Sequence, residues 1–246
     1  AGGAIGKRAK SRNVSLFAGN FRRVGELTIG VVLGEYNFTH HRSRKKDAPD
    51  PEAGRVSVVV AKPEDHQSLP DDVAAVTSGV YFTRDLVNAP SNVLTTESFA
   101  DQLTALGEMG VEVEVIEEDQ MAKLGMNTLL AVGQGSESPS KMVIMRWKGG
   151  GDEAPLALVG KGVVFDTGGI SIKPAGGMED MTMDMGGAGV VAGVMKALAA
   201  RGAKANVTGL VGLVENMPDG RAMRPGDVVT SMKGDTVEII NTDAEG

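Results

Sequence analysis

The chain has 246 residues, of which 41% are hydrophobic and 23% charged, as expected for a folded protein with one large domain or two unequal domains. The formal net charge of −7 provides no general attraction for nucleic acid or an anionic membrane, so a small soluble substrate fits better. Because the chain contains no cysteine, disulfides and thiolate chemistry are excluded, and any metal must bind through nitrogen or oxygen ligands. No apolar run approaches membrane-spanning length, and Ala1 to Asn20 lacks the apolar stretch of a signal peptide, so we expect a cytoplasmic protein without a membrane partner.

The first 65 residues are expected to form part of a smaller α/β domain. Strands are predicted at Val14–Phe17, Glu26–Leu33 and Arg55–Val60. A charged loop broken by prolines lies between the second and third of these runs and contains His40, His41, Arg42, Arg44, Lys45, Lys46, Asp47, Pro49 and Pro51. A stripe of apolar residues predicts a helix from Asp71 to Asn88, and we expect residues 66–90 to connect this domain to the next one.

Residues 91–246 are expected to form a second, catalytic α/β domain, because strands and helices alternate along this part of the chain. Its central sheet is predicted to be mixed, mostly parallel and flanked by helices. The predicted strands are Val111–Ile116, Met142–Trp147, Leu156–Val159, Val207–Val214 and Val237–Ile240. One helix is predicted from Thr96, its expected cap, to about Met109, and a second from Gly187 to Ala200. In such sheets ligands bind beyond the carboxyl ends of the strands.

Acidic and basic residues cluster next to the predicted strands and the second helix. Lys161 and Asp166 follow Leu156–Val159, Asp184 precedes the helix, and Asp243 and Glu245 follow Val237–Ile240. A single acid after a strand is as readily explained as a helix cap or turn residue. Carboxylates gathered at one sheet edge repel each other, however, and a pair of divalent cations such as Zn²⁺, Mn²⁺ or Mg²⁺ would neutralise them. The combination therefore favours a two-metal site without histidine or cysteine ligands.

Longer motifs carry a resemblance to a known family. The segments Val159–Pro174 (VGKGVVFDTGGISIKP), Asp184–Ala188 (DMGGA) and Asn241–Gly246 (NTDAEG) resemble the leucyl aminopeptidase, or cytosol aminopeptidase, family. The similarity also includes Arg84–Pro90 (RDLVNAP), Asn216–Pro218 (NMP) and Arg224–Asp227 (RPGD), so that it covers the chain from about Pro70 onward. The first part of the chain matches only loosely.

The resemblance implies two divalent metal ions per subunit, held by Lys161, Asp166, Asp184, Asp243 and Glu245. Asp166 and Glu245 would bridge the metals, Asp243 would complete one site, and Lys161 and Asp184 would complete the other. A lysine that binds a metal must be neutral, so the cations would have to lower the pKa of Lys161.

The resemblance also implies roles in substrate binding. Lys173 would stay charged and polarise the scissile carbonyl. The free amine of the substrate would bind near Asp184, Met181 would form a wall of the side-chain pocket, and Asn241 would also bind the substrate.

The implied activity is the removal of N-terminal leucine and other apolar residues from peptides by a water molecule that the metals activate. Zn²⁺ or Mn²⁺ is expected, with Mg²⁺ and Co²⁺ as further candidates, because carboxylate sites accept all four. The implied assembly is a homo-hexamer. In the family the last motif continues with an arginine that holds a bicarbonate as general base, and this chain ends at Gly246. We therefore expect a fragment that lacks the start of the N-terminal domain and the end of the catalytic domain.

The alternative is a DNA-binding or structural protein on an aminopeptidase scaffold. It is suggested by two basic clusters in the first domain, Lys7, Arg8, Lys10 and Arg12, and Arg42 to Lys46. The acidic net charge and the lack of a recognisable DNA-binding motif argue against nucleic acid as a partner. His40 and His41 are interpreted as part of a solvated loop. Ser171 lacks a G-x-S-x-G elbow and a histidine nearby in sequence, which argues against a serine hydrolase.

Overall fold

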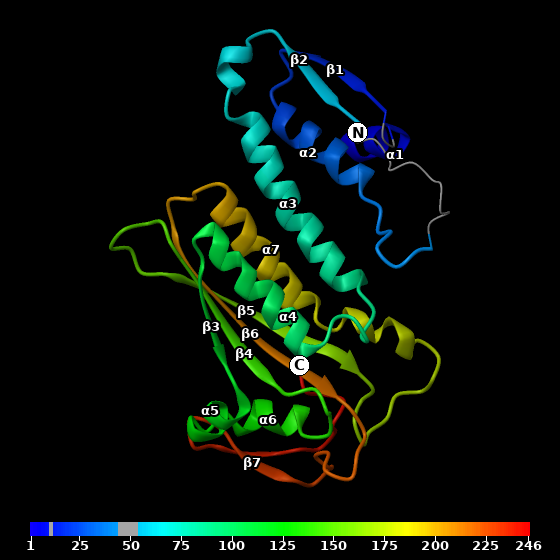
Figure 1. Ribbon diagram of the computed structural model, residues 1–246, viewed down its shortest axis with the longest axis vertical. Coiled ribbons are helices and arrows are strands. Elements are labelled where there is room, and N and C mark those ends of the chain that lie inside the picture. The colour runs from blue at the N-terminus through cyan, green and yellow to red at the C-terminus, as the bar shows by residue number, and fades with distance from the viewer. Residues whose placement is uncertain (10–11, 44–53) are drawn as a thin grey trace. The chain divides into compact units, whose positions relative to one another are not determined.

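The computed structural model describes residues 1–9, 12–43 and 54–246 (Figure 1). These residues form two compact units, Ala1–Tyr81 and Phe82–Gly246, and the division between them falls within one helix. Part of the predicted charged loop lies outside the described residues, namely Arg44, Lys45, Lys46, Asp47, Pro49 and Pro51. The same holds for Lys10 of the first basic cluster.

The first unit combines helices with a small parallel sheet. Its elements are α1 (Gly2–Ala9), β1 (Val14–Gly19), α2 (Val24–Glu35), β2 (Val56–Val60), the 3-10 helix η1 (Pro63–His66) and the first part of α3 (Leu69–Asn88). Strands β1 and β2 pair in parallel, with Val14 opposite Val56. The α/β character predicted for this part of the chain is therefore present.

The strand predicted at Glu26–Leu33 is wrong, because these residues lie in α2. The β-branched residues of this run favour a strand locally, but the run does not alternate strictly between apolar and polar residues. In the folded unit α2 packs closely against α1, and a Cβ added at Gly6 would lie only 2.0 Å from the carbonyl oxygen of Val31. This glycine-mediated contact between the helices outweighs the local preference of Glu26–Leu33 for a strand.

The second unit is built on a mixed four-stranded sheet, as predicted. Its strands are β3 (Glu112–Ile116), β4 (Lys141–Lys148), β5 (Leu156–Asp166) and β6 (Asn206–Asn216), in the order β3-β4-β6-β5. β5 and β6 pair in parallel, whereas β3 with β4 and β4 with β6 pair antiparallel. The expectation that most pairs would be parallel is therefore not met by the described strands.

Short helices explain this difference. The helices between β3 and β4 are α5 (Glu118–Lys123) and α6 (Asn127–Gly133), and neither is long enough to return the chain along the whole length of a strand. The chain instead starts β4 beside the end of β3, with Met142 opposite Ile116. A connection that stays at one end of the sheet produces an antiparallel pair.

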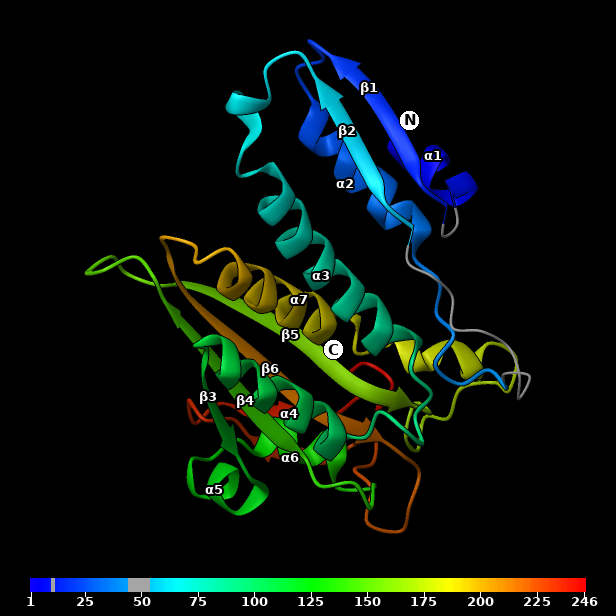
Figure 2. The same ribbon diagram turned by 45° about the horizontal axis from the view of Figure 1, so that its top comes forward.

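Helices cover both faces of this sheet (Figures 1 and 2). A Cβ added at Gly209 of β6 would meet Val191 and Met195 of α7 (Gly186–Ala200), whereas a Cβ added at Gly212 would meet Leu129 of α6. Since residues three apart on a strand point to opposite faces, α6 and α7 lie on opposite sides of the sheet. Helix α4 (Thr96–Thr104) and the 3-10 helix η2 (Ala105–Met109) contribute to the same core as α7.

The N-terminal cap of α4 is Thr95 and not Thr96 as predicted. Thr95 Oγ1 accepts a hydrogen bond from the backbone N–H of Ser98 at 3.2 Å, and the Thr95 N–H donates to Ser98 Oγ at 2.9 Å. This reciprocal pair is a capping box, which fixes the start of the helix one residue earlier than the threonine chosen from the sequence.

The strand predicted at Val237–Ile240 is not part of the central sheet. It is replaced by the short β8 (Thr236–Glu238), which pairs antiparallel with β7 (Val228–Thr230). All three β8 residues are exposed. A tight turn explains this local pairing, because the N–H of Gly234 donates to the carbonyl of Ser231 at 2.9 Å.

Helix α7 approaches β5 very closely. A Cβ added at Gly160 of β5 would lie 2.6 Å from the carbonyl oxygen of Gly187. Together with the 3-10 helix η3 (Met178–Met183), α7 forms the one described helical stretch, Met178–Ala200, that is long and apolar enough to cross a membrane. Buried residues of α7 such as Ala192 and Met195 belong to the hydrophobic core, which identifies it as a core helix.

We expect Gly160→Ala to lower the free energy of unfolding by about 1–3 kcal/mol, since the new methyl group would overlap the backbone of α7. Thermal or urea unfolding measures this change. Gly186→Ala is the matched control, because no atom lies within 4 Å of a Cβ added there. The control should stay within about 0.5 kcal/mol of the parent. Equal stability of the two variants would contradict the close contact.

Candidate metal centre

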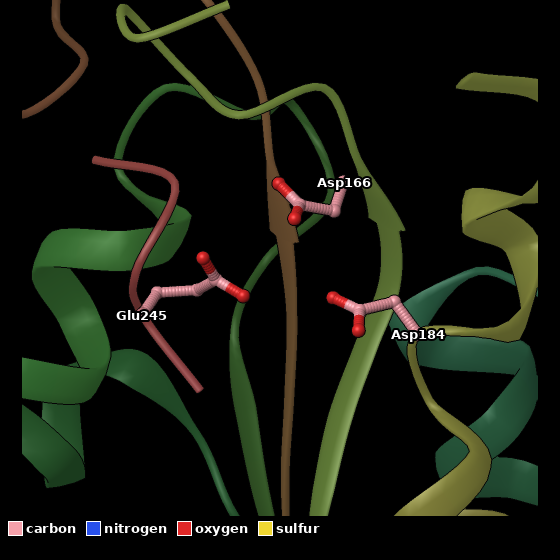
Figure 3. Close-up of side chains that lie close together, drawn as sticks. All are labelled: Asp166, Asp184 and Glu245. Carbon is pink, nitrogen blue, oxygen red and sulfur yellow. The ribbon is translucent and has the colours of Figure 1, made fainter. Parts of the chain in front are cut away.

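Three acidic side chains converge at the carboxyl end of β5. Asp166 ends this strand, Asp184 lies just before α7, and Glu245 belongs to the segment Asn241–Gly246 that follows β8. Figure 3 shows their carboxylates pointing toward one another from three different segments. One oxygen atom from each lies within 4.8 Å of the other two. Acids that are far apart in the sequence thus form one cluster.

Two lysines lie among the acids. The Nζ atom of Lys161 is 2.9 Å from Asp184 Oδ2 and 2.7 Å from Glu245 Oε1. The Nζ atom of Lys173 is 2.9 Å from Asp166 Oδ2 and also contacts Asp243. The structure therefore brings together all five residues predicted as metal ligands, and Lys173 with them.

The electrostatics of the two lysines are governed by these contacts. Burial lowers the pKa of Lys173, but hydrogen bonds to Asp243 and Asp166 outweigh it and raise the pKa well above its usual value. Burial also lowers the pKa of Lys161, and its contacts with Glu245 and Asp184 again raise it overall. Both side chains are therefore ammonium ions in this arrangement.

Asp184 is a partly buried acid whose charge Lys161 compensates. Burial raises its pKa, although the neighbouring Lys161 acts in the opposite direction. Its Oδ2 atom is buried and lies 2.9 Å from Lys161 Nζ, with which it forms an ion pair. A buried carboxylate oxygen is costly unless a cation or a donor reaches it, and the Lys161 ammonium group does so here.

The donor set fits divalent cations. Four carboxylates, those of Asp166, Asp184, Asp243 and Glu245, face two ammonium groups, which leaves two negative charges uncompensated. Hard and borderline divalent cations prefer carboxylate oxygens. Among the described residues this is the one group of three or more acids, histidines or cysteines placed to hold a metal ion.

The two remaining predicted site residues lie on segments that border the cluster. Met181 is in η3, three residues before Asp184, and is partly buried. Asn241 accepts a hydrogen bond at its Oδ1 atom from the Asp243 N–H at 2.8 Å. With Glu245 it also lines a mainly apolar cavity of about 510 Å³ that extends to α6.

Sequence reasoning missed two buried polar residues, Asn216 and Thr242. Asn216 is 2% exposed and donates from Nδ2 to Asp166 Oδ1 at 2.9 Å. Thr242 is fully buried and donates from Oγ1 to the carbonyl of Gly168 at 2.6 Å. The signal available in the sequence was the position of Asn216 two residues after the predicted strand Val207–Val214, since Asp166 was also found among the residues that follow a predicted strand.

The basic clusters of the first unit are described only in part. Lys7, Arg8, Arg12 and Arg42 are exposed, whereas Lys10 and Arg44 to Lys46 lie outside the described residues. The rings of His40 and His41 lie 5.3 and 5.6 Å from the ring of Phe38. The nucleic-acid alternative therefore stays a prediction.

Comparison with known proteins agrees with the motifs. Residues 81–246 match the cytosol aminopeptidase family, catalytic domain. The chain is 62% identical over 246 residues to the probable cytosol aminopeptidase of Dinoroseobacter shibae, and the match covers all of this chain and 50% of that protein. The chain thus spans about half the length of these curated relatives.

Solved structures with the same fold include two informative relatives. The bottromycin maturation enzyme BotP in complex with Mn has 38% identity and a TM-score of 0.80, covering 91% of this chain and 46% of that one. The cytosol aminopeptidase of Coxiella burnetii has 31% identity and a TM-score of 0.79, covering 91% of this chain and 46% of that one.

We expect Lys161→Met to lower the stability of the metal-free protein by about 1–3 kcal/mol, because Asp184 and Glu245 would lose their shared counter-ion. Because Lys161 is partly exposed, solvent screening keeps this loss below that of a fully buried pair. Chemical denaturation in the presence of a chelator measures it. Lys123→Met is the control, since the Lys123–Asp119 ion pair is 76% exposed on both sides and should contribute less than about 0.5 kcal/mol. If both variants were as stable as the parent, Lys161 would not compensate the acids.

Proposed function

Because this chain belongs to the cytosol aminopeptidase family, we propose that the protein is a metal-dependent aminopeptidase acting on peptides, with leucine and other apolar N-terminal residues preferred. The observation that carries the proposal is the convergence of Asp166, Asp184 and Glu245 within 4.8 Å in the domain that the family match covers. A carboxylate cluster of this kind, whose negative charge exceeds the positive charge of its lysines, is suited to holding two divalent cations.

The proposed ligand assignment follows the family resemblance. Asp166 and Glu245 would bridge the two cations, Asp243 would bind one, and Lys161 and Asp184 would bind the other. The two negative charges that Lys161 and Lys173 leave uncompensated among the four carboxylates support cations at this position. Mn²⁺ is the first metal to test, because the related BotP structure is a complex with Mn. Zn²⁺, Mg²⁺ and Co²⁺ suit the same oxygen ligands.

The role proposed for Lys161 requires it to lose its proton. In the arrangement described here its two acidic neighbours raise its pKa overall. A neutral Lys161 is therefore a property proposed for the metal-loaded site only, where the positive charge of the cations opposes a second positive charge nearby.

The side chains around the cluster have distinct proposed tasks. When bound, a pair of divalent cations supplies Lewis-acid polarisation of the scissile carbonyl and a water of lowered pKa. Lys173 is held as an ammonium ion by Asp166 and Asp243, and it can donate to the carbonyl oxygen as negative charge develops there. Asp184 provides an acceptor for the free amino group of the substrate, which would limit cleavage to the first residue. Met181 and Asn241 are proposed to contact the substrate.

Further properties of the whole protein are proposed by its similarity to the family. They are a cytoplasmic location, in keeping with relatives named cytosol aminopeptidases, a homo-hexameric assembly, and a bicarbonate that acts as general base. The proposed domain organisation is a partial N-terminal domain at residues 1–65, a linker helix at 66–90 and a catalytic domain at 91–246.

We expect chelation to abolish hydrolysis of leucine amide by the full-length protein, and addition of Mn²⁺ or Zn²⁺ to restore it. Asp184→Ala should lower kcat/KM by more than about 100-fold, because a proposed metal ligand and amine acceptor is lost. Initial rates and metal content measured on the same samples test this. Asp180→Ala is the matched control, as this acid is exposed in η3 four residues earlier. Equal activity with and without chelator would refute metal dependence.

We expect Lys173→Met to lower kcat by roughly 10²–10³-fold with a small change in KM, since a preorganised donor to the developing oxyanion is removed. Steady-state kinetics at saturating metal measure both constants. Lys233→Met serves as the control, because Lys233 is 86% exposed and pairs with Asp235 on the β7–β8 hairpin. An unchanged kcat, or a loss explained entirely by reduced metal content, would argue against the role of Lys173.

A further inference from the structure

A buried amide lies at the junction of the segments that carry the acids. Asn216 is the last residue of β6, and its partner across the parallel pair is Asp166, the last residue of β5. The Asn216 side chain is 2% exposed. It therefore sits where the two strands end and beneath the surface on which the carboxylates converge.

Both hydrogens of this amide are used, and they bind different segments. Nδ2 donates to Asp166 Oδ1 at 2.9 Å and to the backbone carbonyl of Thr242 at 2.9 Å. Asp166 and Thr242 are far apart in the sequence, and Thr242 lies directly before Asp243 in the segment that also carries Glu245. One side chain thus joins the end of the central sheet to the segment that brings two further acids.

The bond to Asp166 fixes the orientation of its carboxylate. Asp166 Oδ1 accepts from Asn216 Nδ2 and from the N–H of Gly168 at 2.8 Å, so this oxygen is held by two donors. The other oxygen, Oδ2, faces Lys173 at 2.9 Å. The carboxylate is thereby prevented from rotating freely, and one oxygen is directed into the cluster.

The second half of the junction is a network around Thr242. Its Oγ1 donates to the carbonyl of Gly168 and accepts from the N–H of Ser171 at 2.8 Å, while its own N–H donates to Ser171 Oγ at 3.2 Å. Thr242 is fully buried. These bonds tie the segment Asn241–Gly246 to the loop after β5, so that Asp243 and Glu245 are held in a fixed position relative to Asp166.

We infer that Asn216 is a positioning residue for the metal centre. Its two amide hydrogens hold Asp166 and the segment that carries Asp243 and Glu245 in fixed positions relative to each other. This inference rests on the proposed function. Asn216 reaches the cluster through other residues and is not itself placed as a ligand. Groups that orient metal ligands in this way typically change metal affinity about 10–100-fold when they are removed.

The test compares two asparagines at opposite ends of one strand in the full-length protein. Asn206 begins β6, and its Nδ2 donates to the carbonyls of Gly151 at 2.8 Å and Glu153 at 2.7 Å. Asn206→Ala removes these two bonds, and a third that the Gly150 N–H donates to Asn206 Oδ1 at 2.9 Å, at the end of β6 far from the acids. Isothermal titration with Mn²⁺ measures the dissociation constant, and thermal unfolding in chelator measures stability without metal.

Asn216→Ala is expected to weaken Mn²⁺ binding by about 10–100-fold, and Asn206→Ala should lower the unfolding temperature while changing the dissociation constant less than about twofold. If the Asn216 variant binds Mn²⁺ as tightly as the parent, the residue has a structural role alone and the inference is overturned. If the parent itself binds no Mn²⁺, Zn²⁺, Co²⁺ or Mg²⁺, the proposed function fails, and the inference fails with it.

A second pair of variants tests the Thr242 side of the same network if Asn216→Ala does not fold. Thr242→Val removes the hydroxyl that holds Gly168 and Ser171, whereas Thr242→Ser keeps it. The valine variant should bind Mn²⁺ at least about tenfold more weakly, and the serine variant should recover most of the affinity. Equal affinity of the two variants would contradict a network that positions the ligands.

Discussion

The repulsion among four carboxylates is the constraint around which the second unit is organised. At a separation of 4.8 Å, two unit negative charges repel by roughly 3–4 kcal/mol at an effective dielectric constant near 20. Several such terms together are comparable to the whole stability of a domain, which is about 5–15 kcal/mol. Lys161 and Lys173 offset part of this repulsion, because each ammonium group contacts two of the acids. The cluster can therefore form within a stable fold while keeping a residual negative charge.

The surrounding structure brings these charges together in a defined way. Parallel pairing of β5 and β6 ends both strands at the same edge, and this places Asp166 beside Asn216. The close contact between Gly160 and Gly187 brings the start of α7, and with it Asp184, up to the same edge. The third segment has little regular structure, and hydrogen bonds from Asn216 and Thr242 hold it instead. Strand pairing, glycine packing and buried polar bonds thus each position a different acid.

The sequence predicted the parts of this arrangement that depend on local pattern. Asp166 was found because it follows a run of β-branched residues, and Asp184 because it precedes a glycine-rich helix. Long-range packing could not be predicted from local pattern in the same way. The local sequence of Glu26–Leu33 favours a strand, but these residues form a helix packed against α1. Asn216 was noted only within a motif, since a lone asparagine after a strand carries no sign that its two amide hydrogens will join distant segments.

The internal lysines also change how metal binding has to be considered at this centre. In sites whose ligands gather only around the ion, binding and folding share one free energy. Here the ammonium groups of Lys161 and Lys173 already pair with all four acids. A cation that enters the cluster must compete with these ion pairs. Its free energy of binding is therefore the free energy of the bonds that it makes less that of the contacts that it replaces. Rigid placement of the ligands favours the cation in this exchange, because carboxylates that are already oriented lose less conformational freedom when the ion binds.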